Sequence, residues 1–194
     1  ERAAVRINDR QAAYEMTLHL VSLGHSRIGF IKGHPNQSAS IRRLEGYVDA
    51  LDEAGIAVQN DYIAQGYFTY RSGLDAAEHI LALPDAPTAI FASNDDMAAA
   101  TVAIAHRGGL DVPGDLTVCG FDDTSLATTI WPELTTIRQP ISAMSRAAVE
   151  LLVKMLRARR AQDEDMPAHL VLDHTLIRRQ SDAPPRVRPR VVGR

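Results

Sequence analysis

The sequence predicts an α/β fold in which a parallel sheet is flanked by helices. Short apolar runs alternate with amphipathic stretches about five times, which is typical of parallel strands joined by right-handed helical crossovers. Glycine or proline follows most of the expected helices and supports their boundaries. The stretch 116–140 adds a buried strand that ends at two carboxylates, in the position where open parallel sheets bind ligands.

The first half of the chain is predicted to contain two strand–helix units. In the first helix, apolar residues recur every three or four positions and form one buried stripe, and Gly24 ends it. Ser38 or Ser40 is the expected N-cap of the second helix. The expected elements are a strand over 5–7, a helix over 10–23, a strand over 27–31 and a helix from 38 or 40 to 53.

The next two units follow the same order. Ser72 is the expected cap of the third helix, and Pro84 prevents its continuation. Asn94 begins the fourth helix as its cap, ahead of two carboxylates. The expected elements are a weak strand over 62–67, a helix over 72–83, a strand over 87–92 and a helix that ends at 107.

The last third is predicted to hold a strand over 116–121, a short extended piece over 134–137, a long helix over 142–160 and a strand over 170–177. Residues from 181 onward are rich in Pro and Arg without periodicity, which predicts a tail with little fixed structure. The helices over 10–23 and 142–160 both need an apolar surface. If they share one sheet, we expect most of that sheet to lie outside this chain.

Composition and charge narrow the class of protein. The chain has 194 residues and a net charge of −3, which argues against a nucleic-acid surface over the whole chain. Its single cysteine, Cys119, lies within an expected strand, so we interpret it as a buried packing residue. A chain without a disulfide framework suits the reducing cytoplasm. No stretch approaches about 18 consecutive apolar residues, so we expect no membrane span.

No catalytic, cofactor or metal motif is recognisable. There is no G-x-G-x-x-G after a strand and no phosphate-binding glycine loop, so no nucleotide site is indicated. The seven histidines show neither an H-E-x-x-H motif nor Cys/His ligand spacing. The adjacent carboxylates Asp122 and Asp123 have no nearby His, Ser or Lys to complete a catalytic set. We therefore expect a protein that is not an enzyme and holds no cofactor or metal.

Polar side chains follow several expected strands, at the edge where a parallel sheet binds ligands. Arg43 offers a rigid fork of donors, Asn94 both a donor and an acceptor, and Asp122 a carboxylate that accepts from two hydroxyls. An aromatic face beside such groups favours a neutral polyhydroxylated ring as the ligand. The loop after the third strand supplies the aromatic residues Tyr67, Phe68 and Tyr70.

Each of these residues also has a purely structural interpretation. Arg43 can pair with Glu45 or Asp49 on its own helix. Asn94 can serve only as a helix cap, and the aromatic residues can belong to the core. Asp122 and its neighbour can form a helix cap or a solvated turn. The residue types alone leave these alternatives open.

Five segments resemble signature blocks of the lactose/galactose repressor (LacI/GalR) family of transcription regulators. They occur in the family's order and extend over nearly the whole expected fold. The segments are H-L…L-G-H…I-G-F-I…G over 19–33, R-L-E-G-Y over 43–47, A-I-F-A-S-N-D-D-M-A over 89–98, L-D-V-P-G-D-L-T-V…G-F-D-D over 110–123, and P…L-T-T-I…Q-P over 132–140.

The resemblance implies a fold like type I periplasmic sugar-binding proteins, with two lobes and an effector between them. It also implies a homodimer that binds operator DNA through an N-terminal helix-turn-helix absent from this chain, and we expect the first lobe to be largely missing. The implied divisions are the end of the first lobe over 1–27, the second lobe over 28–137, a return to the first over 138–160, a return to the second over 161–178, and a disordered tail over 179–194.

Matched residue by residue, the family's effector-contacting positions fall on Arg43, Asn94 and Asp122. Phe68 falls where an aromatic residue stacks on the ligand, and Gln139 lies near the cleft. The implied ligand is a small effector, a sugar, although nucleobase effectors also occur in the family.

Two functions of different classes share this expected fold. One is the ligand-sensing part of a transcription regulator, and the other is an extracytoplasmic sugar-binding protein that feeds a transporter. The segments P-E-L-T-T-I-R-Q-P and G-F-D-D favour the regulator.

Overall fold

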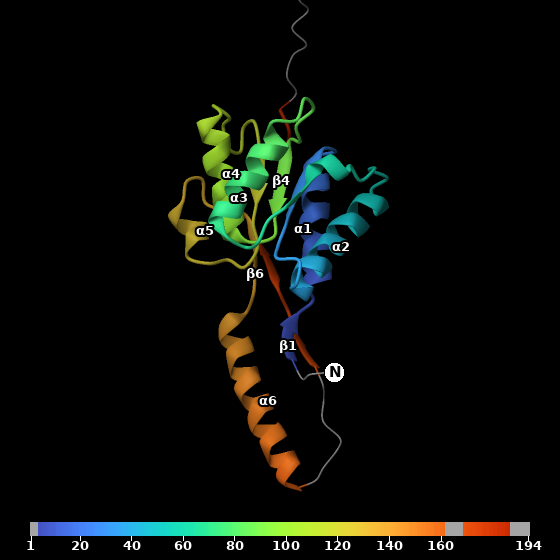
Figure 1. Cartoon of the computed structure of the whole chain (residues 1–194), viewed down its shortest axis with the longest axis vertical. Coiled ribbons are helices and arrows are strands. Elements are labelled where there is room, and N and C mark those ends of the chain that lie inside the picture. The colour runs from blue at the N-terminus through green and yellow to red at the C-terminus, as the bar shows by residue number, and fades with distance from the viewer. Residues whose placement is uncertain (1–3, 162–168, 187–194) are drawn as a thin grey trace, which may run out of the picture.

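The computed structural model describes residues 4–161 and 169–186 and confirms the α/β fold (Figure 1). A four-stranded parallel sheet, in the order β3-β2-β4-β5, forms the centre of its larger part. The elements are β1 (Ala4–Ile7), α1 (Asp9–Ser22), β2 (Ile28–Lys32), α2 (Ser38–Glu53), a 3₁₀ turn (Asn60–Tyr62), β3 (Ile63–Gln65), α3 (Tyr70–Leu81), β4 (Ala89–Ala92), α4 (Asp95–Arg107), β5 (Thr117–Cys119), α5 (Leu126–Thr129), β6 (Thr136–Arg138), α6 (Ile141–Ala161), β7 (His169–Leu172) and β8 (Thr175–Ile177).

Helices cover both faces of the central sheet, because successive side chains of a strand point to opposite faces. Ile28 and Phe30 of β2 pack with α1 and α2 in one core cluster. Ile31, one position later, packs with α3 and α4 in the other. Cys119 is completely buried in the first cluster, as expected for a packing residue.

Two of the expected helix caps are wrong, and one is confirmed. Gln37 precedes α2 and makes no side-chain cap hydrogen bond. The cap of α3 is Thr69, whose side chain accepts from the Ser72 backbone N–H, so Ser72 lies inside the helix. Asn94 caps α4 by accepting from the Met97 N–H.

Helix α1 packs on the central sheet, so its apolar face is covered within this chain. Its buried stripe includes Met16 and Leu20, which share a core cluster with Phe30 and with Tyr47 of α2. This packing contradicts the expected grouping of residues 1–27 with a separate first lobe. The apolar surface that α1 needs is supplied by the sheet that follows it in sequence.

The second part of the molecule is formed by β1, β7 and α6, and the β6–β8 pair leads to it (Figure 1). Strand β1 pairs in parallel with β7, and β6 pairs antiparallel with β8. The single strand expected over 170–177 is therefore wrong, because the chain breaks at Asp173 and His174 and each half finds a different partner. The pairing also places residues 169–172 beside β1 instead of in the second lobe.

Helix α6 runs away from the central sheet (Figure 1). Several of its apolar side chains are exposed. Val149, Leu152 and Leu156 are 63%, 56% and 55% exposed. Of the two helices expected to lack a covering surface within this chain, α6 is the one that leaves its apolar side chains exposed. Among the described residues, no helix has both the length and the apolar character needed to cross a bilayer.

Residues 179–186 do not form the expected tail. Ser181 is completely buried, and its backbone carbonyl accepts from the Val118 N–H of β5 at 2.9 Å. The Asp182 carboxylate accepts from His19 and from Arg178, both at 2.9 Å. These contacts place the segment beside β5, although its composition predicts disorder. The rest of the expected tail, 187–194, lies outside the described residues.

Candidate functional site

The predicted site residues line one pocket of about 290 Å³ at the carboxyl ends of the central strands. Each comes from a different element: Arg43 from α2, Phe68 from the loop after β3, Asn94 from the start of α4, Asp122 from beyond β5, and Gln139 from beyond β6. The strand-end argument predicts that Arg43, Phe68, Asn94 and Asp122 lie together, and all four line this pocket. Gln139 is expected near it only from the family resemblance. Two further residues complete the lining, Gln37 and Ala39.

Arg43 is a buried anchor of this pocket, only 5% exposed. Its Nε donates to the Asp9 carboxylate at 2.8 Å, and its Nη1 donates to the Ser93 carbonyl at 2.5 Å. The guanidinium carbon lies 3.6 Å from the centre of the Phe121 ring, which is a cation–π contact. Neither of the partners considered from sequence, on its own helix, accounts for Arg43.

Asp9 is a residue that the sequence reasoning missed. It lies two residues beyond the end of β1, which ends at Ile7, and is the first residue of α1. Its side chain is 8% exposed and forms an ion pair with Arg43. The same strand-end signal therefore could have found it. Its partner lies 34 residues away, so the pairing itself could not be inferred.

Asn94 and Phe68 are joined by a hydrogen bond. The Asn94 amide group donates to the Phe68 carbonyl at 3.0 Å, while its oxygen caps α4. Asn94 is thus a helix cap and also a pocket residue. Phe68 has a positive φ of 62°, which is uncommon for a residue with a side chain. Its ring lies against Gly33, where a Cβ would come within 2.0 Å of the ring.

Asp122 presents a carboxylate to the pocket from a left-handed backbone conformation, with a φ of 107°. Its Oδ1 accepts from the Gln139 amide at 2.6 Å and lies 3.7 Å from Nη1 of Arg43. Burial raises the pKa of Asp122, and the charge of Arg43 and the hydrogen bond from Gln139 partly oppose that shift. Most of the acceptor capacity of this carboxylate remains for a ligand.

Two carboxylates behind the pocket hold the loop that carries Asp122. Asp123 accepts from Arg138 and from Arg179, each at 2.6 Å. Burial pushes the pKa of Asp123 up, but these two arginines outweigh it and hold the pKa below its usual value. Asp95 is completely buried and accepts from Thr124 and Thr136; burial raises its pKa to about 6.

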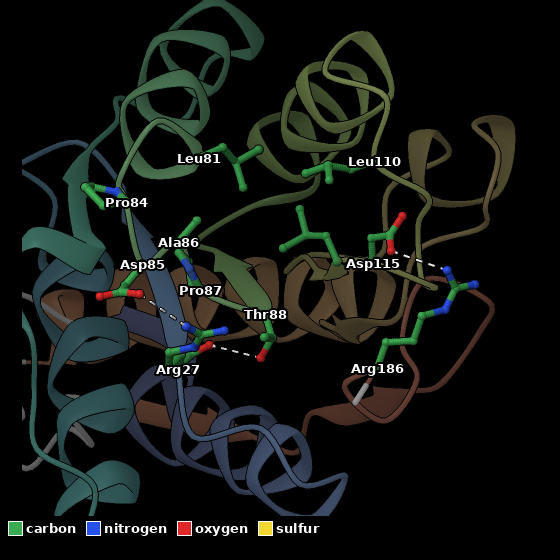
Figure 2. A pocket seen from close by; sticks show the side chains of 11 residues that line it. Arg27, Leu81, Pro84, Asp85, Ala86, Pro87, Thr88, Leu110, Asp115 and Arg186 are labelled. Atoms are coloured by element: carbon green, nitrogen blue, oxygen red, sulfur yellow. Dashed lines mark hydrogen bonds and ion pairs between the residues drawn. The ribbon is translucent and has the colours of Figure 1, made fainter. Parts of the chain in front are cut away.

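A larger pocket of about 350 Å³ lies at the opposite, amino ends of the strands (Figure 2). In it, Arg27 pairs with Asp85 at 3.9 Å, and Arg186 pairs with Asp115 at 3.4 Å. None of the predicted site residues contributes to its lining. Among the described residues, no group of His, Cys, Asp or Glu side chains is suited to hold a metal ion.

The chain matches one protein-family model and several curated proteins. The model, described as a periplasmic binding protein-like domain, matches residues 17–181. The HTH-type transcriptional repressor CytR of Escherichia coli K12 is 41% identical over 157 residues, which cover 81% of this chain and 46% of that protein. The HTH-type transcriptional repressor PurR of Photobacterium profundum is 39% identical over 153 residues, 79% of this chain and 46% of that protein. The chain thus spans about half the length of these relatives.

Solved structures that superpose on this chain are also transcriptional regulators. A complex of the transcriptional regulator CelR with cellobiose superposes with a TM-score of 0.86 at 33% identity, over 93% of this chain and 54% of that chain. A LacI family transcriptional regulator from Mycobacterium smegmatis gives a TM-score of 0.87 at 29% identity, over 96% and 68% of the two chains. These relatives are regulators and not enzymes, in agreement with the prediction from sequence. The chain belongs to the LacI/GalR family of transcriptional regulators, of which it carries the periplasmic binding protein-like domain.

Proposed function

We propose that this chain is the ligand-sensing domain of a transcription regulator. A small effector, a sugar, binds in the pocket formed by Arg43, Phe68, Asn94, Asp122 and Gln139, in the cleft between two lobes. Its binding controls operator recognition by an N-terminal helix-turn-helix outside this sequence. The observation that carries the proposal is the convergence of these five side chains, from five elements, on one pocket.

The charges around the pocket favour a neutral ligand over an anionic one. The positive charge of Arg43 is balanced by Asp9 at 2.8 Å. Asp122 is 3.7 Å from that guanidinium and has only an amide, from Gln139, at hydrogen-bonding distance. The pocket therefore presents a carboxylate without a full counter-charge, which would repel a phosphate or a second carboxylate. Hydroxyl groups donate to such a carboxylate without bringing charge.

The side chains of the pocket suit a ring that carries several hydroxyl groups. The Asp122 carboxylate can accept from two neighbouring hydroxyls, and charge-assisted hydrogen bonds are roughly twice as strong as neutral ones. Phe68 lines the same pocket and offers an aromatic face for the C–H side of the ring. One relative of known structure is described as a complex with cellobiose, which supports a sugar as the ligand class.

A thermal-shift screen tests the ligand class. The panel contains the neutral sugars glucose, galactose, ribose and cellobiose and the anionic glucose 6-phosphate, gluconate and glucuronate. A ligand at 100 times its Kd stabilises the folded state by about 2.7 kcal/mol, which moves the melting temperature measurably. We expect at least one neutral sugar to raise Tm and the anionic counterparts to have little effect. Stabilisation by the anionic compounds alone would contradict the proposal.

We also propose that the protein acts in the cytoplasm as a homodimer. The relatives named above are transcriptional regulators, and this function requires access to the chromosome. The alternative, an extracytoplasmic sugar-binding protein of a transporter, has no support from these relatives.

A further inference from the structure

The loop that carries Asp122 is anchored at three consecutive residues. The Asp122 N–H donates to the Ile137 carbonyl at 2.8 Å. The Asp123 carboxylate is bound by two arginines, and the Thr124 N–H donates to Asp95 at 2.7 Å. Asp122 and Asp123 both have positive φ values, 107° and 57°, which L-residues rarely adopt. Such a backbone persists only when surrounding contacts hold it.

Asp123 makes the strongest of these anchors. Its side chain is 7% exposed, and each carboxylate oxygen accepts from one arginine, Oδ2 from Arg138 and Oδ1 from Arg179. Both distances are 2.6 Å, in the range of charge-assisted hydrogen bonds. Asp123 does not line the pocket, and both of its oxygens already have donors. Its contacts therefore indicate a role in placing other residues.

The two arginines belong to opposite ends of the β6–β8 ladder. Arg138 is the last residue of β6 and pairs with Thr175 at one end. Arg179 lies two residues beyond β8, past the Thr136–Ile177 pair at the other end. Arg179 also donates to the Leu134 carbonyl at 2.8 Å. One carboxylate thus ties both ends of the ladder to the loop after β5.

The same ladder places the second pocket residue of this region. Gln139 directly follows Arg138, and it donates to Asp122 at 2.6 Å. The neighbouring carboxylates Asp122 and Asp123 therefore bind two neighbouring residues at the end of β6, Gln139 and Arg138. A shift of Arg138 would move Gln139 and the Asp122 carboxylate together.

We propose that Asp123 is a positioning residue of the effector site. Through Arg138 and Arg179 it holds the β6–β8 ladder against the loop after β5, and so keeps Asp122 and Gln139 in the geometry that receives the ligand. The link to effector binding rests on the function proposed above, whereas the effect on the loop does not require a ligand.

Amide hydrogen exchange without ligand tests the positioning of the loop. In Asp123→Asn, we expect the amides of Asp122 and Thr124 to exchange at least tenfold faster, while the Val118 amide of β5, which donates to the Ser181 carbonyl, keeps its rate. Asp123→Glu, which keeps both acceptors, should recover part of the protection. The matched control is Asp115→Asn, which removes an ion pair with Arg186 away from this loop and should leave all three amides unchanged.

The outcomes separate a positioning role from general stabilisation. Equal acceleration of Val118 would assign Asp123 to overall stability and overturn the proposal, as would unchanged exchange at Asp122 and Thr124. A second arm titrates glucose, galactose, ribose and cellobiose into wild type and Asp123→Asn, and we expect at least tenfold weaker binding in the variant. If none of these sugars binds the wild type, the proposed ligand class fails, while the exchange result still decides the role of Asp123.

Discussion

Arg43 contributes to the fold as well as to the pocket. Its guanidinium is buried and pairs with the buried Asp9, so removing it leaves a carboxylate without its partner. We expect Arg43→Ala to lower the free energy of unfolding by about 3–5 kcal/mol, the usual cost of breaking a buried ion pair. Urea unfolding measures this.

The control for Arg43 is an exposed pair between the same two helices. Arg10 pairs with Asp49 at 2.6 Å, with side chains 54% and 39% exposed. Water screens an exposed pair of this kind, so Arg10→Ala should have only a small effect on the free energy of unfolding. An Arg43→Ala variant as stable as Arg10→Ala would contradict the structural role of Arg43.

The buried carboxyl group of Asp95 makes the free energy of unfolding decrease as pH rises. Burial raises its pKa from 3.8 to about 6, so the folded protein binds this proton more tightly than the unfolded chain. The stabilisation is complete below about pH 4 and is lost as pH rises through about 6. We expect the unfolding free energy of wild type minus that of Asp95→Asn to fall by about 1–3 kcal/mol from pH 4 to pH 7. A constant or rising difference would show that burial does not raise the pKa of Asp95 in the folded protein.

At the residue scale, the sequence predicts where the site lies better than how it is held. Arg43, Asn94 and Asp122 could be found because each lies in a loop or helix start that comes after a strand, and strand ends meet at one edge of a parallel sheet. Their partners could not be found in the same way. Asp123 pairs with residues 15 and 56 positions away, and such long-range pairings leave no local pattern.

The loop after β2 shows how one element shapes another. At Gly33, a Cβ would come within 2.0 Å of Phe68 Cζ. We expect Gly33→Ala to displace the Phe68 ring and to lower the unfolding free energy by about 1–3 kcal/mol, as overpacking does. Urea unfolding measures the loss, and a crystal structure of the variant shows the ring.

Gly108→Ala is the matched control. The nearest atoms to a Cβ at Gly108 are 3.5 Å away, and its φ of −81° suits any residue. This variant should be nearly as stable as wild type. A Gly33→Ala variant with equal stability and an unmoved ring would show that Gly33 does not determine the place of Phe68.

At the element scale, the helices are predictable because their apolar stripes repeat locally, whereas strand partners are not. Within 170–177, the chain divides at Asp173, and its halves pair with β1 and β6 in separate sheets. Likewise, the Arg- and Pro-rich composition around Ser181 does not predict that this residue is buried, because its burial depends on a backbone contact with Val118. Both errors arise from contacts between segments distant in sequence.

The molecule as a whole leaves apolar surface on α6 and at a loop tip. Leu152 and Leu156 are more than half exposed, and Trp131 is 73% exposed. Exposed apolar surface of this kind often marks a protein interface. Together with the expected homodimer, it predicts a dimer at micromolar concentration in sedimentation velocity experiments. A monomer under these conditions would remove the proposed assembly.

Isothermal titration calorimetry on Asp122→Asn tests the central claim, that the pocket at the strand ends binds a neutral sugar. The ligand is the sugar among glucose, galactose, ribose and cellobiose that binds the wild type most tightly. The variant keeps the shape of the side chain but loses its charge and one acceptor, so we expect affinity to fall by about tenfold to a hundredfold, or about 1.4–2.8 kcal/mol. Asp85→Asn, at a side chain that is 90% exposed in the other pocket, should bind as wild type does. Equal affinity of Asp122→Asn and wild type would show that the effector does not bind at this pocket.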